Sequence, residues 1–143
     1  MTEEIDTSSI NCMPNKLGLT SATDLAREEE RISKKKAKGL FEQNLLGELE
    51  PGKFTTLRFI HRTLFGDIYD FAGQKRTVNL AKGSFRFAPV VDAALENIDR
   101  MPQSTFDEII EKYVEMNIAH PFREGNGRSM RIWLDHILKN RLD

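Results

Sequence analysis

The sequence is poor in cysteine, in long apolar runs and in net charge. Cys12 is the only cysteine among 143 residues, which excludes an internal disulfide and a metal site built from several thiolates, and which is typical of a reducing compartment. No run approaches the roughly 18 to 20 apolar residues that cross a bilayer. The acidic, polar N-terminus lacks the basic and apolar segments of a secretory signal. We therefore expect a cytoplasmic protein that makes no use of a membrane.

Charges of the two signs nearly cancel along the chain. The 21 basic and 22 acidic residues leave a net charge of −1, so no overall field attracts a nucleic-acid backbone, and any anion must be recognised locally. A lysine cluster over residues 34–38 is neutralised by Glu28–Glu30 and indicates a solvated helical face. The length suits one globular domain with one core. We predict an irregular arm over residues 1–20 and a single domain over residues 21–143.

The spacing of apolar residues predicts a mainly helical protein of the all-α class. Repeats of three and four residues indicate helices that begin near Ser21, after Pro51-Gly52, near Pro89 and at Ser104 or Thr105. Ser21 or Thr23 could cap the first of these helices, and Ser104 or Thr105, with Asp107 or Glu108 three residues on, forms a capping-box signature for the fourth. Two short β-compatible runs, residues 76–80 and 84–87, flank a glycine-containing turn and predict one short β-hairpin. An isolated hairpin is only marginally stable, so this hairpin needs a functional reason.

The second predicted helix carries a histidine beside its apolar stripe. The stripe is formed by Phe54, Leu57, Ile60, Leu64 and Phe65, with His61 next to it. A histidine in such a position is more often hydrogen-bonded within the core than catalytic. We expect His61 to be packed, and Gly66 to end the helix.

The most informative stretch is residues 120–131, with the sequence HPFREGNGRSMR. Pro121 disfavours helical backbone angles at His120, so a helix should end there. Gly125 and Gly127 let the backbone approach a ligand closely just before the next helix begins. The first N–H groups of that helix lack partners within it and form an anion-binding site.

Five side chains around this turn suit triphosphate chemistry. Arg128 and Arg131 are three residues apart, so they share one face of the helix, and guanidinium groups bind phosphate oxygens well. The Glu124 carboxylate beside those phosphates indicates a bridging Mg²⁺ ion. His120 titrates near neutral pH and can accept a proton from a hydroxyl as general base. Asn117 lies one helical turn earlier on the same side.

This stretch resembles the signature of the Fic (filamentation induced by cAMP) family, His-x-Phe-x-Asp/Glu-Gly-Asn-Gly-Arg-x-x-Arg, at every defined position. Residues 67–73, 82–87 and 111–119 also look like those of small single-domain bacterial Fic proteins, and the resemblance covers residues 15–142. It implies an all-helical core in which the signature joins two central helices. The hairpin would then be a flap that lies over the active site.

The resemblance implies a protein adenylyltransferase that uses Mg²⁺ and ATP to place AMP on a Tyr, Thr or Ser hydroxyl of another protein. His120 would be the catalytic base and Glu124 the metal ligand. The residues implied to bind the nucleotide are Lys82, Asn117, Gly125, Asn126, Gly127, Arg128, Ser129 and Arg131, and those implied to dock the target are Gly83, Ser84 and Phe85. Within this set, Arg128 would serve the β-phosphate and Arg131 the γ-phosphate. Relatives that transfer the γ-phosphoryl group have a lysine in place of Gly127, so the glycine favours AMP transfer.

The resemblance also implies a bacterial toxin or a regulator of cell division, with type II topoisomerase subunits as candidate targets and no direct contact with nucleic acid. Many relatives carry an inhibitory helix with Ser/Thr-x-x-x-Glu-Gly/Asn, of which we find no convincing copy. The sequence stops at Asp143, so we expect a form without intramolecular inhibition. Transfer of UMP or phosphocholine, and a nucleotide-sensing module without turnover, stay open as alternative functions. Pairing with further copies of the chain is also open.

Overall fold

The computed structural model describes residues 12–77, 79–82, 85–86 and 92–142. Within these ranges the chain forms five helices: α2 (Ala22–Glu42), α3 (Phe54–Phe65), α4 (Asp92–Arg100), α5 (Phe106–Ala119) and α6 (Asn126–Arg141). The mainly helical fold predicted from apolar spacing is confirmed. Residues 12–20, the described end of the predicted arm, form neither helix nor strand.

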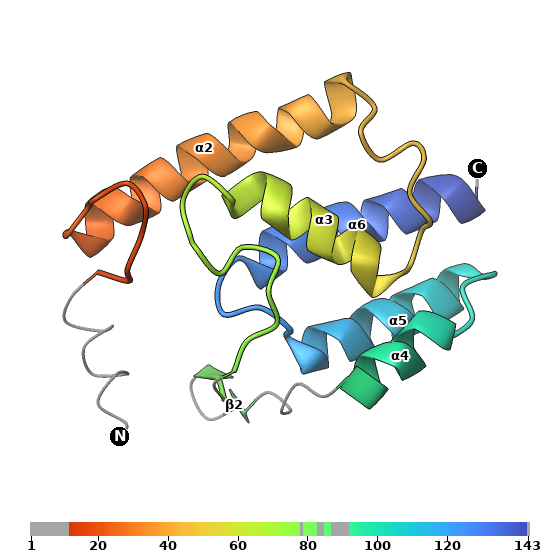
Figure 1. The fold of residues 1–143 in the computed structure, drawn as a ribbon. Helices are drawn as coiled ribbons and strands as arrows, with labels where there is room; N and C mark the ends of the chain where they lie inside the picture. Colours follow the sequence, from red (N-terminus) through yellow and green to blue (C-terminus); the bar gives the residue numbers. More distant parts are fainter. Residues whose placement is uncertain (1–11, 78, 83–84, 87–91, 143) are drawn as a thin grey trace.

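The helices pack around one core, with α3 and α6 at its centre. α3 packs against α2 and α6, while α5 packs against α6 and α4. Figure 1 shows α2 along one side of the central pair and α4 and α5 along the other. The core side chains include Leu25, Leu40, Leu57, Ile60, Leu64, Leu95, Ile98, Ile109, Met116, Met130, Trp133 and Ile137. The loop of residues 120–125 connects α5 to α6, so packed helices hold both of its ends.

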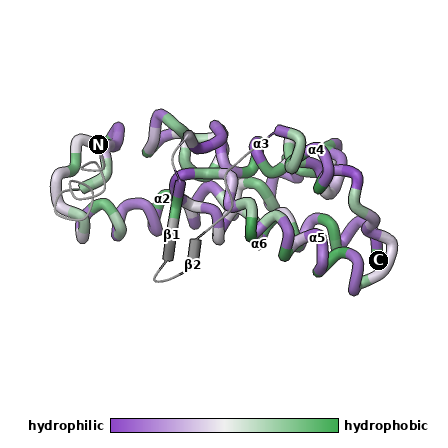
Figure 2. Tube along the Cα trace, turned by 90° about the horizontal axis from the view of Figure 1, so that it is seen from below, coloured by the Kyte–Doolittle hydropathy of each residue, from purple (hydrophilic) through white to green (hydrophobic). Residues whose placement is uncertain are grey.

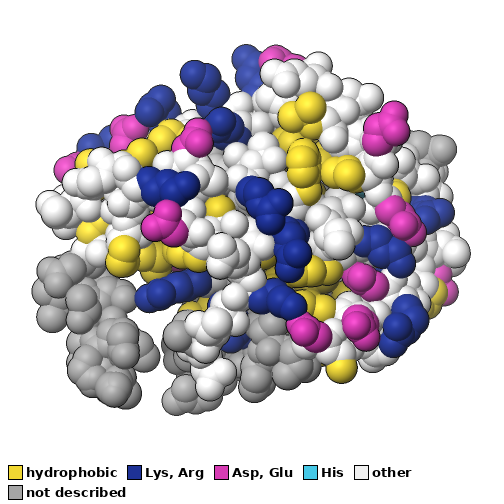
Figure 3. Space-filling view, viewed as in Figure 1, with side chains coloured by type: hydrophobic (Ala, Val, Ile, Leu, Met, Phe, Trp, Pro, Cys, Tyr) yellow, Lys and Arg dark blue, Asp and Glu magenta, His cyan; other side chains and the backbone are white. Residues whose placement is uncertain are grey.

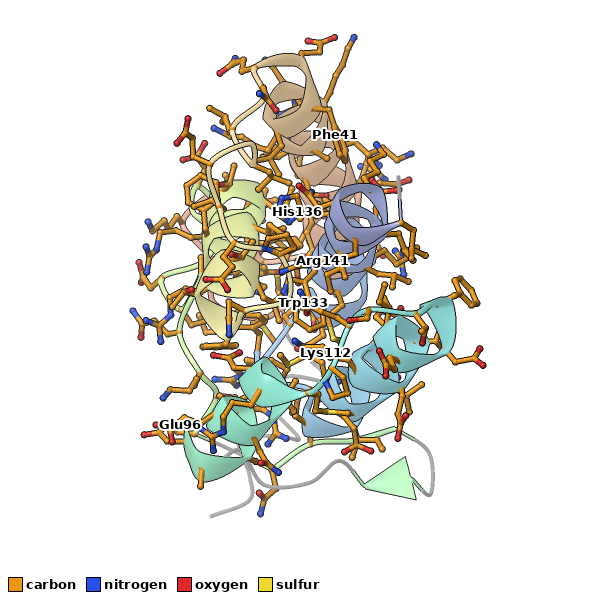
Figure 4. All side chains as sticks on the ribbon, turned by 90° about the vertical axis from the view of Figure 1, so that its right-hand side faces the viewer. Phe41, Glu96, Lys112, Trp133, His136 and Arg141 are labelled. Atoms are coloured by element: carbon orange, nitrogen blue, oxygen red, sulfur yellow. The ribbon has the colours of Figure 1, made fainter. Side chains whose placement is uncertain are left out.

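α3 buries the stripe that its sequence predicts. Phe54, Leu57, Ile60, His61, Leu64 and Phe65 are all buried. Gly66 is the C-cap of the helix, as expected. The indole N–H of Trp133 donates to the carbonyl oxygen of Lys53 at 3.0 Å, and this bond attaches α6 to the start of α3 (Figure 4).

α2 combines an apolar stripe with two buried polar residues. Ser21, one of the two predicted caps, accepts a hydrogen bond from the Asp24 N–H at 3.2 Å. Leu25 and Leu40 are buried, but so are Glu29 and Ser33. Lys34, Lys35 and Lys38 are exposed, as predicted for the lysine cluster. Glu29, one of the acidic residues expected to neutralise that cluster, instead faces the interior and finds partners there.

α5 begins at the predicted capping box. The Thr105 hydroxyl accepts from the Glu108 N–H, and the Glu108 carboxylate accepts from the Thr105 N–H, each at 3.1 Å. The predicted cap is confirmed, and it satisfies two of the N–H groups that a helix start leaves without partners.

The buried face of α5 combines Ile109, Met116 and Ala119 with a lysine, while two of its large apolar residues are exposed. Phe106 and Val114 are 55% and 45% exposed, whereas Lys112 is 1% exposed. The Lys112 ammonium donates to the Gln103 side chain at 2.7 Å and to the carbonyl oxygens of Asp99 and Met101 at 3.3 Å. Lys112 can be buried because its ammonium group has hydrogen-bond partners, two of them backbone carbonyl groups at the end of α4 (Figure 4).

The strand prediction needs correction. Strand β1 (Ala81–Lys82) pairs antiparallel with β2 (Phe85–Arg86), with Ala81 opposite Arg86. The described residues of the predicted run 76–80 are not in a strand. The Arg76 N–H instead donates to the carbonyl oxygen of Pro121 at 2.8 Å. The backbone at Arg76 is therefore hydrogen-bonded to the loop after α5 and not to a neighbouring strand. Gly83 and Ser84 lie outside the described residues.

Polar, apolar and charged residues are mixed along the described helices. Figure 2 shows hydrophilic and hydrophobic positions alternating along the helices, and Figure 3 shows basic and acidic side chains interspersed on the face in view. In the ranges that the structure describes, no helix has the length and apolar character to cross a membrane.

Candidate active site

His120 lies at the end of α5 in a left-handed conformation. It is the C-cap, with φ 47° and ψ 64°, which confirms that the helix ends before Pro121. Its Nδ1 atom lies 3.3 Å from the carbonyl oxygen of Asn117. Because a carbonyl oxygen can only accept, this contact requires the proton on Nδ1, and the neutral ring then has its lone pair on Nε2. That tautomer suits proton uptake at Nε2.

Arg76 binds the carbonyl groups at the end of α5. Its Nε donates to the His120 carbonyl oxygen at 2.6 Å, and its Nη2 donates to that of Ala119 at 3.0 Å. The last carbonyls of a helix lack N–H partners within it, so this arginine satisfies them and holds the backbone of His120. The guanidinium is buried, and burial lowers its pKa. The sequence offers no local sign of this role, because the two residues are 44 positions apart.

The side chain of Asn126 ties the loop of residues 120–125 to the first turn of α6. Its Oδ1 accepts from the Phe122 N–H at 2.9 Å, and its Nδ2 donates to the Phe122 carbonyl oxygen at 2.6 Å. Asn126 is 3% exposed. The loop therefore engages both polar side-chain atoms of this predicted nucleotide-binding residue, and its side chain is buried.

His61 connects the same loop to the segment after α3. Its Nδ1 accepts from the Gly73 N–H at 2.9 Å, so its Nε2 carries the hydrogen and donates to the Glu124 carbonyl oxygen at 2.7 Å. The ring stacks on Phe122, with 3.8 Å between centroids. Burial lowers the pKa of His61 from 6.5 to about 4, although the bond to Glu124 opposes the shift. The prediction of a packed, hydrogen-bonded histidine is confirmed.

The depressed pKa of His61 predicts a loss of stability in acid. Between its unfolded pKa of 6.5 and its folded pKa of about 4, the unfolded chain binds a proton that the folded chain does not. The contribution of His61 is thus complete above pH 6.5 and falls by about 3 kcal/mol as the pH drops towards 4. Urea unfolding at pH 7 and pH 4 should show a steeper loss for the wild type than for His61→Gln. Burial also lowers the pKa of His136. Because His136 is present in both proteins, its contribution to the loss of stability cancels in the comparison. Equal losses in the two proteins would contradict the prediction.

Gly125 makes the sharp turn into α6. Its φ is 80°, in the left-handed region, and it is the N-cap of a helix that no side chain caps. A Cβ atom at this position would lie 2.4 Å from Cε2 of Phe65, so both the backbone and the available space require glycine. Ser129, a predicted nucleotide-binding residue, has no exposed surface, and its hydroxyl donates to the Gly125 carbonyl oxygen at 2.8 Å.

Arg128 and Arg131 line one groove, as expected for residues on one helical face. The groove has a volume of about 330 Å³ and lies between α2 and the first half of α6. Nη1 of Arg128 donates to the Ser33 hydroxyl at 2.9 Å and to the Glu29 carboxylate at 3.4 Å. Two guanidinium groups beside an uncapped helix start can bind more than one phosphate.

Glu124 is the acidic residue of this region. It is exposed. Neighbouring protein atoms displace part of the water around its carboxylate and raise its pKa, and the negative charge of Glu29 raises the pKa further, against Arg128 and Arg123. A nearby cation would favour the ionised form. Within the described ranges no three His, Cys, Asp or Glu residues are grouped so as to hold a metal ion. Glu124 therefore fits a Mg²⁺ ion that takes its other ligands from phosphates and water.

The remaining predicted site residues are placed less fully. Asn117 and Gly127 are exposed, one before His120 and one in the first turn of α6. Lys82 pairs with Phe85 through the backbone of the hairpin. The predicted docking residues Gly83 and Ser84 lie outside the described residues.

Comparison with known proteins gives matches over most of the chain. The Fic/DOC family matches residues 52–138. The chain is 30% identical over 141 residues to the probable protein adenylyltransferase Fic of Salmonella typhimurium, covering 90% of this chain and 68% of that protein. It is 30% identical over 136 residues to the protein adenylyltransferase VbhT of Bartonella schoenbuchensis, covering 85% of this chain but only 28% of that protein.

A solved structure shares the fold. The crystal structure of BepC, a VirB-translocated effector of Bartonella tribocorum with bound AMPPNP, superimposes with a TM-score of 0.69. The alignment covers 90% of this chain and 73% of that one, at 21% identity. At this identity the likeness concerns the fold.

Proposed function

Because the chain belongs to the Fic/DOC family, we propose that it is a protein adenylyltransferase, which transfers AMP from ATP to a Tyr, Thr or Ser hydroxyl of another protein. The observation that carries the proposal is the junction between α5 and α6. There a histidine, an exposed carboxylate and two arginines flank an uncapped helix start. The names of the relatives from Salmonella and Bartonella support the reaction, and the AMPPNP bound to BepC supports the nucleotide.

The triphosphate of ATP binds at the start of α6. The backbone N–H groups of residues 125–127 surround the α-phosphate region, since no side chain caps this helix. Arg128 then serves the β-phosphate and Arg131, one turn further along the groove, serves the γ-phosphate. Positioning of this kind supplies much of the rate in phosphate chemistry.

His120 acts as the general base. The target hydroxyl oxygen forms a bond to the α-phosphorus, the bond between that phosphorus and the bridging oxygen of the β-phosphate breaks, and pyrophosphate leaves. The hydroxyl proton moves to Nε2 of His120, because its Nδ1 already carries a hydrogen that contacts the Asn117 carbonyl oxygen. Arg76 keeps the backbone of His120 in place during this transfer.

Glu124 is the residue that would hold a Mg²⁺ ion bound with the nucleotide. Its exposed carboxylate and its loop position next to Gly125 suit a single protein ligand. The ion, when bound, neutralises charge on the phosphates. His61 and Asn126 keep the loop that carries Glu124 in one conformation.

The hairpin β1–β2 is the flap that docks the target. Two strands of two residues each leave backbone groups at their edges, where an extended target segment adds by hydrogen bonds. The family resemblance assigns Gly83, Ser84 and Phe85 to contact with the target, and Lys82 to contact with ATP. The register of the pairing then decides which hydroxyl meets the α-phosphate.

The position of the label in ATP tests the reaction. Protein incubated with Mg²⁺ and ATP labelled on the α-phosphate should become labelled, on itself or on a target, whereas ATP labelled on the γ-phosphate should leave no label. The reason is that Gly127 stands where γ-phosphoryl-transferring relatives have lysine. Label from the γ-phosphate would contradict AMP transfer.

Labelled UTP in parallel separates the alternative of UMP transfer. A protein that binds AMPPNP but forms no covalent product with a panel of hydroxyl-bearing proteins would point to a nucleotide sensor instead.

A further inference from the structure

Glu29 contacts Arg128, the arginine proposed to bind phosphate, and is also held by Tyr69. The Tyr69 hydroxyl donates to one carboxylate oxygen of Glu29 at 2.5 Å, and Arg128 donates to the other. The Glu29 side chain is 12% exposed and the Arg128 side chain 36%. Burial raises the pKa of Tyr69 and the bond to Glu29 raises it further, so the hydroxyl stays protonated and keeps donating.

The contacts use only one end of the guanidinium. Glu29 and Ser33 both meet Nη1 of Arg128, and within the described ranges no hydrogen bond occupies its Nε or Nη2. An arginine fork offers two parallel donors along one edge. Holding Nη1 against α2 therefore orients the fork and leaves its other edge for a ligand in the groove, which Arg128 lines together with Arg131.

We propose that Glu29, supported by Tyr69 and Ser33, is a positioning residue for ATP binding: it holds Arg128 in a phosphate-ready orientation. This inference rests on the proposed function of Arg128 as the β-phosphate clamp. A free arginine would have to lose its rotamer freedom when the nucleotide binds, and that loss weakens binding. Glu29 removes this cost before the ligand arrives.

The test measures binding of AMPPNP with Mg²⁺ by calorimetry. Glu29→Gln keeps the size of the side chain but removes the charge, and it should weaken binding by about five- to tenfold. Tyr69→Phe, which removes only the support of Glu29, should weaken binding by about two- to threefold. Glu28→Gln is the matched control, because Glu28 lies on the same helix and pairs with Arg31 at the surface. It should bind like the wild type.

A double-mutant cycle separates positioning from general damage. In an Arg128→Ala background, Glu29→Gln should have no further effect on the dissociation constant, since Glu29 acts through that arginine. A general loss of packing would instead give additive effects and a lower melting temperature for Glu29→Gln. Additivity would overturn the inference, and so would unchanged or tighter binding by Glu29→Gln. Absence of AMPPNP binding by the wild type would overturn the proposed function and this inference with it.

Discussion

Replacing His120 by alanine should reduce AMP transfer by about 10²- to 10⁴-fold, the range expected for loss of a positioned general base. The attacking hydroxyl would keep its proton, while the uncapped start of α6, Arg128 and Arg131 would still bind the nucleotide. Single-turnover labelling with α-phosphate-labelled ATP measures the rate, and calorimetry with AMPPNP measures binding. We expect the labelling rate to fall by this factor and the affinity for AMPPNP to stay nearly unchanged.

The backbone of His120 calls for a second variant. Its φ of 47° is left-handed, a conformation that asparagine tolerates better than alanine. His120→Asn therefore removes the base and keeps the turn, so it should lose as much transfer as His120→Ala with less effect on the melting temperature. Transfer that survives in both variants would show that another group takes the proton.

Replacing Gly125 by alanine should damage both stability and catalysis. A left-handed φ of 80° is strained for alanine, and the added methyl group would lie 2.4 Å from the Phe65 ring. The two effects together should lower the free energy of unfolding by about 3 kcal/mol. The turn would also shift Glu124 and the start of α6, and displacement of about 1 Å in such a site costs on the order of a hundredfold in rate. Urea unfolding and the labelling assay measure the two effects.

Gly127→Ala, two residues further along in the first turn of α6, is the matched control for stability. A methyl group there would meet only the Arg131 guanidinium, at 3.2 Å, and the end of this side chain can move. The position lies within α6, where alanine is favoured over glycine by about 1 kcal/mol. We therefore expect unfolding at the same or a higher urea concentration. Equal destabilisation by both substitutions would show that the loop does not need the left-handed turn at Gly125.

Much of the candidate site could be read from one stretch of sequence. Pro121 predicted the end of α5, Gly125 predicted the turn, and the spacing of Arg128 and Arg131 predicted their common groove. Gly127, expected in the same turn, lies instead within α6. The side-chain roles were harder to predict. Asn126 and Ser129 were predicted to meet the nucleotide, but their polar side-chain atoms bind the loop itself, because a short turn needs partners for its own backbone groups.

The sequence by itself determined the helical class, narrowed two helix caps to two neighbouring candidates each, and fixed the order of groups from His120 to Arg131. Each of these depends on residues a few positions apart, and local backbone preferences decide them. Only the tertiary structure decided which distant residues contact the stretch from His120 to Arg131. Glu29 meets Arg128 across 99 positions and Arg76 meets His120 across 44. Such pairs depend on how α2, α5 and α6 are rotated against one another, and the packing of the whole core sets that rotation.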